Sequence, residues 1–196
     1  GPPWPFTEPK LHNLGGQMSK VPLTRAIAWG LIGGFVATVG MDIVLIVMSL
    51  LVGMPPVASL STIGDTAAGF FSLLGIQMSG GVLLGAQVHY LLGLVLGAIF
   101  SVGVTQIEAF RLTTIRKGVL LGILYIEVVS QFILAITPFV LTLTASETVQ
   151  WFGVSAFMHL IWGAILGAVV SYGLRVMYPM SLLFRHQGGR NAGSRS

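Results

Sequence analysis

Residues 82–104 of this chain read VLLGAQVHYLLGLVLGAIFSVGV, an apolar run of 23 residues without Lys, Arg, Asp or Glu. A helix needs about 20 such residues to cross the roughly 30 Å hydrocarbon core of a bilayer. Three further apolar runs of similar length cover residues 26–51, 118–141 and 153–176. We therefore predict an all-α integral membrane protein with four transmembrane helices.

The composition supports the same fold class and limits the partners. Only 8% of the 196 residues are charged and 54% are hydrophobic, whereas a soluble domain carries about 25% charged residues. Such a chain cannot cover itself with a polar surface, so we predict that the lipid bilayer solvates most of it. The net charge of +4 does not come with any nucleic-acid-binding module, and we expect no nucleic-acid partner. The absence of cysteine excludes disulfides and thiolate metal sites.

The basic residues lie in alternate connections between the apolar runs. Connections 52–81 and 142–152 contain no Lys or Arg. Segments rich in Lys and Arg stay in the cytoplasm during membrane insertion, so both termini are predicted to be cytoplasmic. The basic residues at the predicted cytoplasmic side are Lys10, Lys20, Arg25, Arg111, Arg116, Lys117, Arg175, Arg185, Arg190 and Arg195.

This topology divides the chain into five segments. The short soluble segments are too small to fold as separate domains, and the Gly/Ser/Arg-rich end of the chain is typical of a flexible tail. The segments are a cytoplasmic N-terminal segment (1–25), a first two-helix unit (26–104) with a long outer loop (52–81), a cytoplasmic loop (105–117), a second two-helix unit (118–176) and a flexible cytoplasmic tail (177–196).

The second and fourth runs resemble each other. Residues 89–103 (HYLLGLVLGAIFSVG) and 159–173 (HLIWGAILGAVVSYG) align without gaps and share seven of fifteen positions. The first and third runs match more weakly, through a Gly-x-x-x-Gly motif in each. Because each unit crosses the membrane twice, we predict a duplicated two-helix hairpin, a parallel repeat whose pseudo-twofold axis follows the membrane normal.

Each of the four runs carries one Gly-x-x-x-Gly motif. Residues four apart lie on one helical face, and glycines there let two helix backbones approach closely in a membrane. We therefore predict a tight four-helix bundle. The packing glycines are Gly30, Gly34, Gly93, Gly97, Gly118, Gly122, Gly163 and Gly167.

The order of motifs resembles a known group of proteins. A helix that ends in Gly53-Met54-Pro55-Pro56 is followed by a His-x-x-x-Gly-x-x-x-Gly helix and then by a second such pair. This pattern resembles small four-helix prokaryotic membrane proteins grouped as a domain of unknown function. The resemblance covers most of residues 25–175. It implies the fold and a location in a prokaryotic cytoplasmic membrane, without implying an activity.

Two histidines are the sharpest candidates for a functional site. His89 and His159 each lie one turn outward of a glycine pair, and the predicted pseudo-twofold axis places them symmetrically. They could be axial ligands of a haem or bind a chlorophyll-type pigment, or hold zinc or copper together with Asp42 or Glu127. Alternatively, each histidine hydrogen-bonds a backbone carbonyl, Asp42 or Gln131 and locks the bundle.

Other polar residues lie at membrane depth, where ionisable groups are costly and often functional. These buried polar candidates are Asp42, Gln87, Glu127 and Gln131. Asp42 and Glu127 could serve a transport or proton path, or they could pair with neighbouring polar groups.

No catalytic motif is present: the chain lacks a His-Glu-x-x-His sequence, a phosphate-binding loop and a dinucleotide fingerprint. Our first hypothesis is a non-catalytic integral subunit or scaffold of a larger membrane protein complex, which contacts other subunits through Trp4-Pro5-Phe6 and the Arg-rich tail. The second is a haem-, pigment- or metal-binding electron-transfer subunit that uses His89 and His159. The third is a small transporter or channel.

Overall fold

The computed structural model describes the backbone of residues 21–192 and the side chains of residues 21–175. The described backbone is helical and contains no strand. Its elements, in chain order, are α1 (Leu23–Leu51), α2 (Ala58–Leu73), α3 (Val82–Gln106), the 3-10 helix η1 (Glu108–Phe110), α4 (Ile115–Leu134), α5 (Ile136–Val140) and α6 (Ala145–Ala192).

Four stretches of helix are long and apolar enough to cross a membrane. They are Leu23–Leu51, Val82–Gln106, Ile115–Val140 and Ala145–Arg175. The shortest has 25 residues, and at about 1.5 Å per residue it is longer than the roughly 30 Å hydrocarbon core. Large apolar side chains such as Phe132, which is 78% exposed, cover the outside of the bundle. These findings confirm the all-helical fold and the four candidate transmembrane helices.

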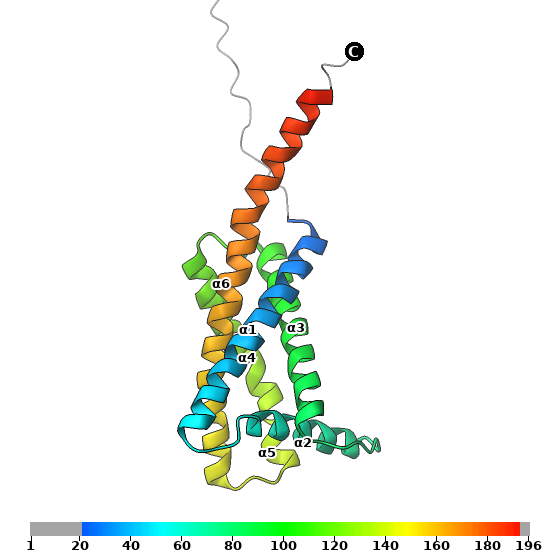
Figure 1. The fold of residues 1–196 in the computed structure, drawn as a ribbon, viewed down its shortest axis with the longest axis vertical. Helices are drawn as coiled ribbons and strands as arrows, with labels where there is room; N and C mark the ends of the chain where they lie inside the picture. Colours follow the sequence, from blue (N-terminus) through cyan, green and yellow to red (C-terminus); the bar gives the residue numbers. More distant parts are fainter. Residues whose placement is uncertain (1–20, 193–196) are drawn as a thin grey trace, which may run out of the picture.

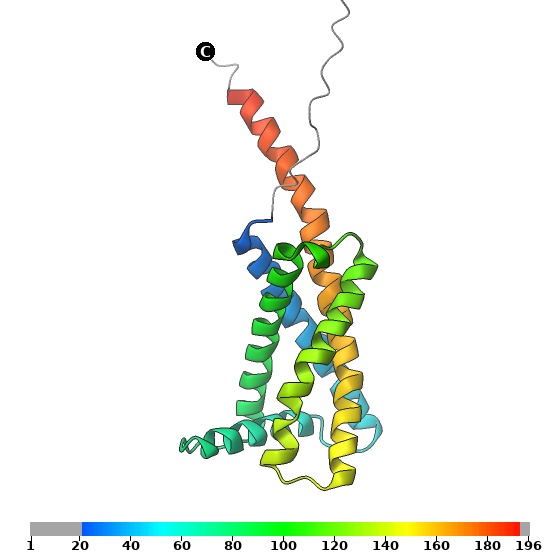
Figure 2. The same cartoon turned by 180° about the vertical axis from the view of Figure 1, so that it is seen from behind.

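The helices pack as two pairs that are joined along one side. α1 packs against α3, α4 packs against α6, and α1 also packs against α6. Figure 1 shows α1 crossing diagonally in front of this assembly. Figure 2 shows α3 and α4 on the opposite side, where the two helices have few direct contacts.

The two ends of the bundle differ in charge. The start of α1 and the C-terminal part of α6 lie at one end, whereas α2 and α5 lie at the other (Figure 1). We call the first the basic end and the second the far end. The halves of the bundle next to these ends are the basic half and the far half. The basic end carries the described basic side chains Arg25, Arg111, Arg116, Lys117 and Arg175.

The predicted glycines lie between the paired helices. A Cβ atom on Gly30 or Gly34 of α1 would meet backbone atoms of α3, around Gly97 and Gly93 respectively. In the other pair, a Cβ atom on Gly122 of α4 would meet the backbone of α6. Gly118 faces Gly167 and Ser171, and Gly122 faces Gly163 and Gly167. Glycine therefore lets the two backbones of each helix pair touch. We call these backbone approaches the glycine contacts.

The buried core lies between α1, α4 and α6, with contributions from α3. Its largest fully buried apolar side chains are Ile126, Leu166 and Val170. Trp29, near the start of α1, packs against Gly173 of α6, because a Cβ atom at Gly173 would overlap the indole ring. This contact joins the two helix pairs at the basic end.

The long connection between α1 and α3 is a packed element. α2 lies across the far end (Figure 1), and Gly64 of α2 sits against Gly81 and Gly85 at the start of α3. The Gly81 N–H donates to Asp65 Oδ1 at 2.8 Å. The Thr66 hydroxyl donates to the Thr137 hydroxyl at 3.2 Å and ties α2 to α5.

The last helix, α6, continues into the segment that the sequence predicts to be a flexible tail. We expected the tail to begin at residue 177, but the backbone of α6 stays helical to Ala192 and projects beyond the other helices (Figure 1). Pro179 removes one backbone donor, and a helix already nucleated by a membrane span can continue past that loss. Residues 1–20 and 193–196, including the predicted contact Trp4-Pro5-Phe6, lie outside the described residues.

Candidate functional site

The far half of the bundle encloses a cavity of about 500 Å³. It lies between the two helix pairs, and all six α-helices contribute to its walls. Aromatic rings and aliphatic chains form most of the wall, including Phe70, Phe71, Trp151 and Trp162. Both predicted histidines, His89 and His159, line it. The structure therefore brings the two histidines to one cavity.

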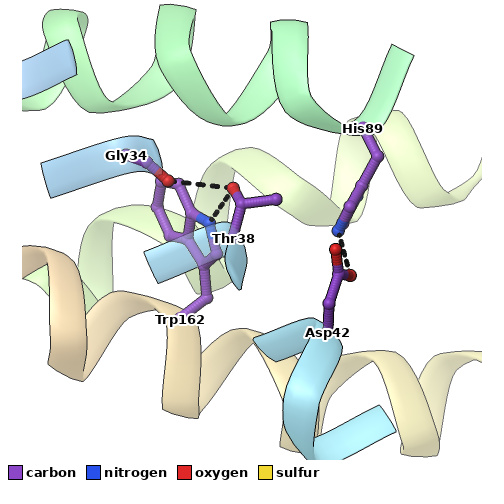
Figure 3. A network of polar contacts seen from close by, with 5 residues as sticks. All are labelled: Gly34, Thr38, Asp42, His89 and Trp162. Atoms are coloured by element: carbon purple, nitrogen blue, oxygen red, sulfur yellow. Dashed lines mark hydrogen bonds and ion pairs between the residues drawn. The ribbon is translucent and has the colours of Figure 1, made fainter. Parts of the chain in front are cut away.

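His89 of α3 is paired with Asp42 of α1. Its Nε2 atom lies 3.1 Å from Asp42 Oδ1, and both side chains are 14% exposed. The distance is that of an ion pair when the imidazole is protonated, although the two groups are not aligned as a hydrogen bond. Figure 3 shows the two side chains pointing toward each other between the helices. The pairing of His89 with Asp42 is one of the structural roles considered from the sequence.

A second polar contact joins the two helix pairs beside the cavity. The Trp162 Nε1–H of α6 donates to Thr38 Oγ1 of α1 at 3.0 Å. The Thr38 hydroxyl in turn donates to the Gly34 carbonyl at 2.9 Å, as Figure 3 shows. Sequence reasoning missed both residues. Their positions relative to the glycine motifs could have indicated them. Thr38 lies one turn after Gly34 on the same face, and Trp162 directly precedes Gly163.

His159 and Ser130 also line the cavity but have no such partner. Ser130 of α4 is 3% exposed, and its hydroxyl makes no hydrogen bond with the described residues. The buried Nδ1 atom of His159 likewise has no hydrogen-bond partner there. The Ser155 carbonyl lies near His159 without meeting hydrogen-bond geometry. Two buried polar groups therefore remain open at one wall of the cavity.

The remaining polar candidates lie away from the cavity. Gln87, expected to be buried, is exposed on α3. The reason is that Gly85, two residues earlier, faces α2, and residues two apart point to nearly opposite sides of a helix. Glu127 and Gln131 are half-buried on α4 and do not line the cavity.

The donor set does not fit the cofactors considered from the sequence. Within residues 21–175, no group of three or more His, Asp or Glu side chains could hold a metal ion. Glu127 is turned away from the cavity, and His89 Nε2 faces Asp42. A haem held by both histidines would have to separate His89 from Asp42, because His89 Nε2 lies 3.1 Å from Asp42 Oδ1.

Comparisons with known proteins add no assignment. No protein-family model, curated protein or solved structure matches this chain. The resemblance to uncharacterised four-helix membrane proteins therefore stays a prediction.

Proposed function

We propose that this protein is a non-catalytic integral subunit, or scaffold, of a larger membrane protein complex in a prokaryotic cytoplasmic membrane. The observation that carries the proposal is a polar face on α4, formed by the half-buried side chains of Glu127 and Gln131, where the described residues leave a carboxyl oxygen of Glu127 without a hydrogen-bond partner. We call it the α4 polar face.

Glu127 lies deep in the predicted membrane span. It follows the start of α4, Ile115, by a distance of about 18 Å at 1.5 Å per residue, near the middle of the hydrocarbon core. One of its carboxyl oxygens is buried without a hydrogen-bond partner in the described structure. A charged carboxylate at the bilayer centre costs about 2.5–3.5 kcal/mol on insertion scales. A partner that supplies a hydrogen-bond donor would remove much of that cost.

Gln131 extends the same polar face by one helical turn. Residues four apart share a helical face, and Gln131 is also half-buried. Lipid tails cannot hydrogen-bond an amide or a carboxyl group, whereas polar side chains across a helix–helix interface can. A transmembrane helix of another subunit, carrying a donor at this depth, is therefore the partner that fits.

The chain itself offers a comparison for this face. In the proposed duplication, Gly30 and Gly34 of α1 correspond to Gly118 and Gly122 of α4. Glu127 and Gln131 then correspond to Val39 and Ile43, and Ile43 is an ordinary lipid-facing residue, 58% exposed. A hairpin of this kind therefore packs without polar groups at these positions, which favours a role beyond packing for the α4 polar face.

The proposal includes the duplication and the orientation. The equivalent glycine contacts in the two helix pairs support a repeated hairpin. The described basic side chains gather at the end where α1 begins and α6 leaves the bundle, which supports cytoplasmic termini.

The test is to isolate the chain from its native membrane in a mild detergent and to measure the size and protein content of its peak. We expect the wild type to co-migrate with other subunits at fixed stoichiometry, and the double variant Glu127→Leu/Gln131→Leu to migrate alone. The control is Gln87→Leu, which replaces an exposed glutamine outside the α4 polar face and should leave the complex intact. A wild-type protein that migrates alone would refute the proposal.

A further inference from the structure

We infer that the cavity in the far half binds a neutral, lipid-soluble molecule whose ring carries carbonyl or hydroxyl oxygens, the chemistry of a quinone. Ser130 and His159 hold the oxygen-bearing ring. The inference rests on the cavity, the burial of these two groups and the charges around them, and it does not depend on the α4 polar face.

The size and the walls of the cavity suit an amphipathic ligand. Its volume of about 500 Å³ lies within the roughly 300–1,000 Å³ range of small-molecule sites. Two indole rings line it, and both of their N–H groups are already engaged. Trp162 donates to Thr38 at 3.0 Å, and Trp151 donates to the Leu134 carbonyl at 3.2 Å. The rings therefore offer their apolar faces to a ligand.

Ser130 and His159 supply the polar contacts. They lie on α4 and α6, which pack together, and both line the cavity with a buried polar atom that has no hydrogen-bond partner in the described structure. A buried polar group without a partner costs about 1–3 kcal/mol. A hydroxyl donates one hydrogen bond, and a neutral imidazole donates one and accepts one. Carbonyl or hydroxyl oxygens of the ligand would satisfy these two groups.

Comparison of the two hairpins sharpens this assignment. In the proposed duplication, His159 corresponds to His89 and Ser130 corresponds to Asp42. In the first hairpin the two residues pair with each other at 3.1 Å. In the second, the position that corresponds to Asp42 holds an uncharged serine, and neither Ser130 nor His159 Nδ1 has a hydrogen-bond partner in the described structure. The second hairpin therefore leaves room for an outside oxygen where the first supplies its own carboxylate.

The charge distribution excludes anionic ligands. Among residues 21–175, no Lys or Arg lines the cavity, and the basic side chains lie at the other end of the bundle. A phosphate or carboxylate would enter a low-dielectric site without a counter-charge, which is strongly unfavourable. An uncharged ring avoids that cost. Leu91, which is 62% exposed, also lines the cavity and marks a side where an apolar tail reaches the lipid.

The test is a titration of the purified protein in detergent with decylubiquinone, followed by tryptophan fluorescence. We expect saturable quenching, because Trp151 and Trp162 line the cavity. Trp151→Phe should reduce the quenched amplitude, whereas Trp29→Phe, which changes a ring packed on Gly173, should not. Ser130→Ala should raise the Kd roughly 3- to 10-fold, as expected for one lost hydrogen bond.

The chain offers a matched control for the serine. Ser171 is also fully buried and also has a hydroxyl without a partner in the described region, but it does not line the cavity. Ser171→Ala should therefore bind decylubiquinone with the wild-type Kd. Equal Kd values for Ser130→Ala and the wild type would overturn the assignment of Ser130. Quenching of the wild type that never saturates would overturn the site itself.

Three further measurements separate the remaining outcomes. If Ser130→Ala does not fold, Ala67→Leu, which fills the cavity from α2, should abolish saturable quenching. Decane, which has the tail chemistry without oxygens, should compete at least tenfold more weakly, and equal competition would refute recognition of the ring. Glu127→Leu/Gln131→Leu should bind decylubiquinone with the wild-type Kd, so a failed subunit proposal and a failed ligand site give different results.

Discussion

The two halves of the bundle are built from the same four long helices but pack in opposite ways. In the basic half, the glycine contacts bring the backbones of α1 and α3, and of α4 and α6, directly together. In the far half the helix pairs separate around a cavity of about 500 Å³. The comparison shows that the close glycine contacts lie within the helix pairs, whereas the free volume lies between the pairs.

The largest effect is expected where the backbones touch. Gly34→Ala places a methyl group against the Gly93 carbonyl of α3. Backbone atoms cannot rotate away as a side chain can, so we expect a loss above about 3 kcal/mol, beyond ordinary overpacking. Unfolding free energy in mixed detergent and SDS, followed by tryptophan fluorescence, measures it.

The control for this change is Gly103→Ala on α3, where an added Cβ atom meets nothing within 4 Å. Alanine is the better helix former by about 0.5–1 kcal/mol, so this variant should be neutral or slightly more stable. Equal losses for the two glycines would show that the close backbone approach is not what holds the basic half together.

A smaller loss is expected at the boundary between the halves. Thr38→Val keeps the side-chain shape but removes the acceptor of the Trp162 N–H, and leaving that donor unpaired costs about 1–3 kcal/mol. Thr105→Val is the matched change, because the Thr105 hydroxyl bonds only carbonyls of its own helix, at 2.9 and 3.0 Å. The same unfolding assay should give the larger loss for Thr38→Val. A larger loss for Thr105→Val would show that the hydrogen bond between the helix pairs does not contribute to stability as proposed.

The Asp42–His89 contact in the far half should contribute less. Polar contacts between membrane helices average about 0.6 kcal/mol, with a maximum near 1.7 kcal/mol. A double-mutant cycle of Asp42→Asn and His89→Gln should return a coupling energy in this range. Strict additivity of the two single changes would mean that the 3.1 Å approach carries no stabilisation.

The smallest effect is expected inside the cavity. Ala67→Leu adds three carbon atoms to a residue of its wall, and the change in unfolding free energy should stay within about 0.5 kcal/mol, because the added atoms enter free volume. Compared directly with Gly34→Ala, this variant tests the contrast between the halves. A loss as large as that of Gly34→Ala would show that the far half is packed as tightly as the basic half.

The membrane spans could be predicted because a helix in lipid must present an apolar surface along its whole length. The run 82–104 agrees with α3 within two residues. The start of α6 was placed at 153, eight residues late, because Glu147 and Gln150 lower the local hydropathy. A capping box marks the true start: the Thr144 N–H donates to Glu147 Oε2 at 2.8 Å, and the Glu147 N–H donates to Thr144 Oγ1 at 3.4 Å.

The contacts within the site could be predicted only in part. The spacing of the glycines fixes their face on each helix, so Gly34 and Gly97 were correctly placed between helices. The contact of Gly64 with Gly85 was not foreseen, because the sequence of α2 does not specify how that helix crosses α3. The cavity was also not foreseen, since it depends on how far the two helix pairs diverge. For the same reason, periodicity could not place Ser130 at its wall.

The Thr38–Trp162 hydrogen bond has a consequence for the order of synthesis. Its two residues are 124 positions apart, and at about 5–20 residues per second the ribosome needs roughly 6–25 s to make the second after the first. α1 can therefore enter the membrane before Trp162 is made. The Thr38 hydroxyl can nevertheless donate to the Gly34 carbonyl of its own helix at once. The first helix therefore enters the bilayer without an unpaired donor at this position, and the last helix finds an acceptor that is already oriented.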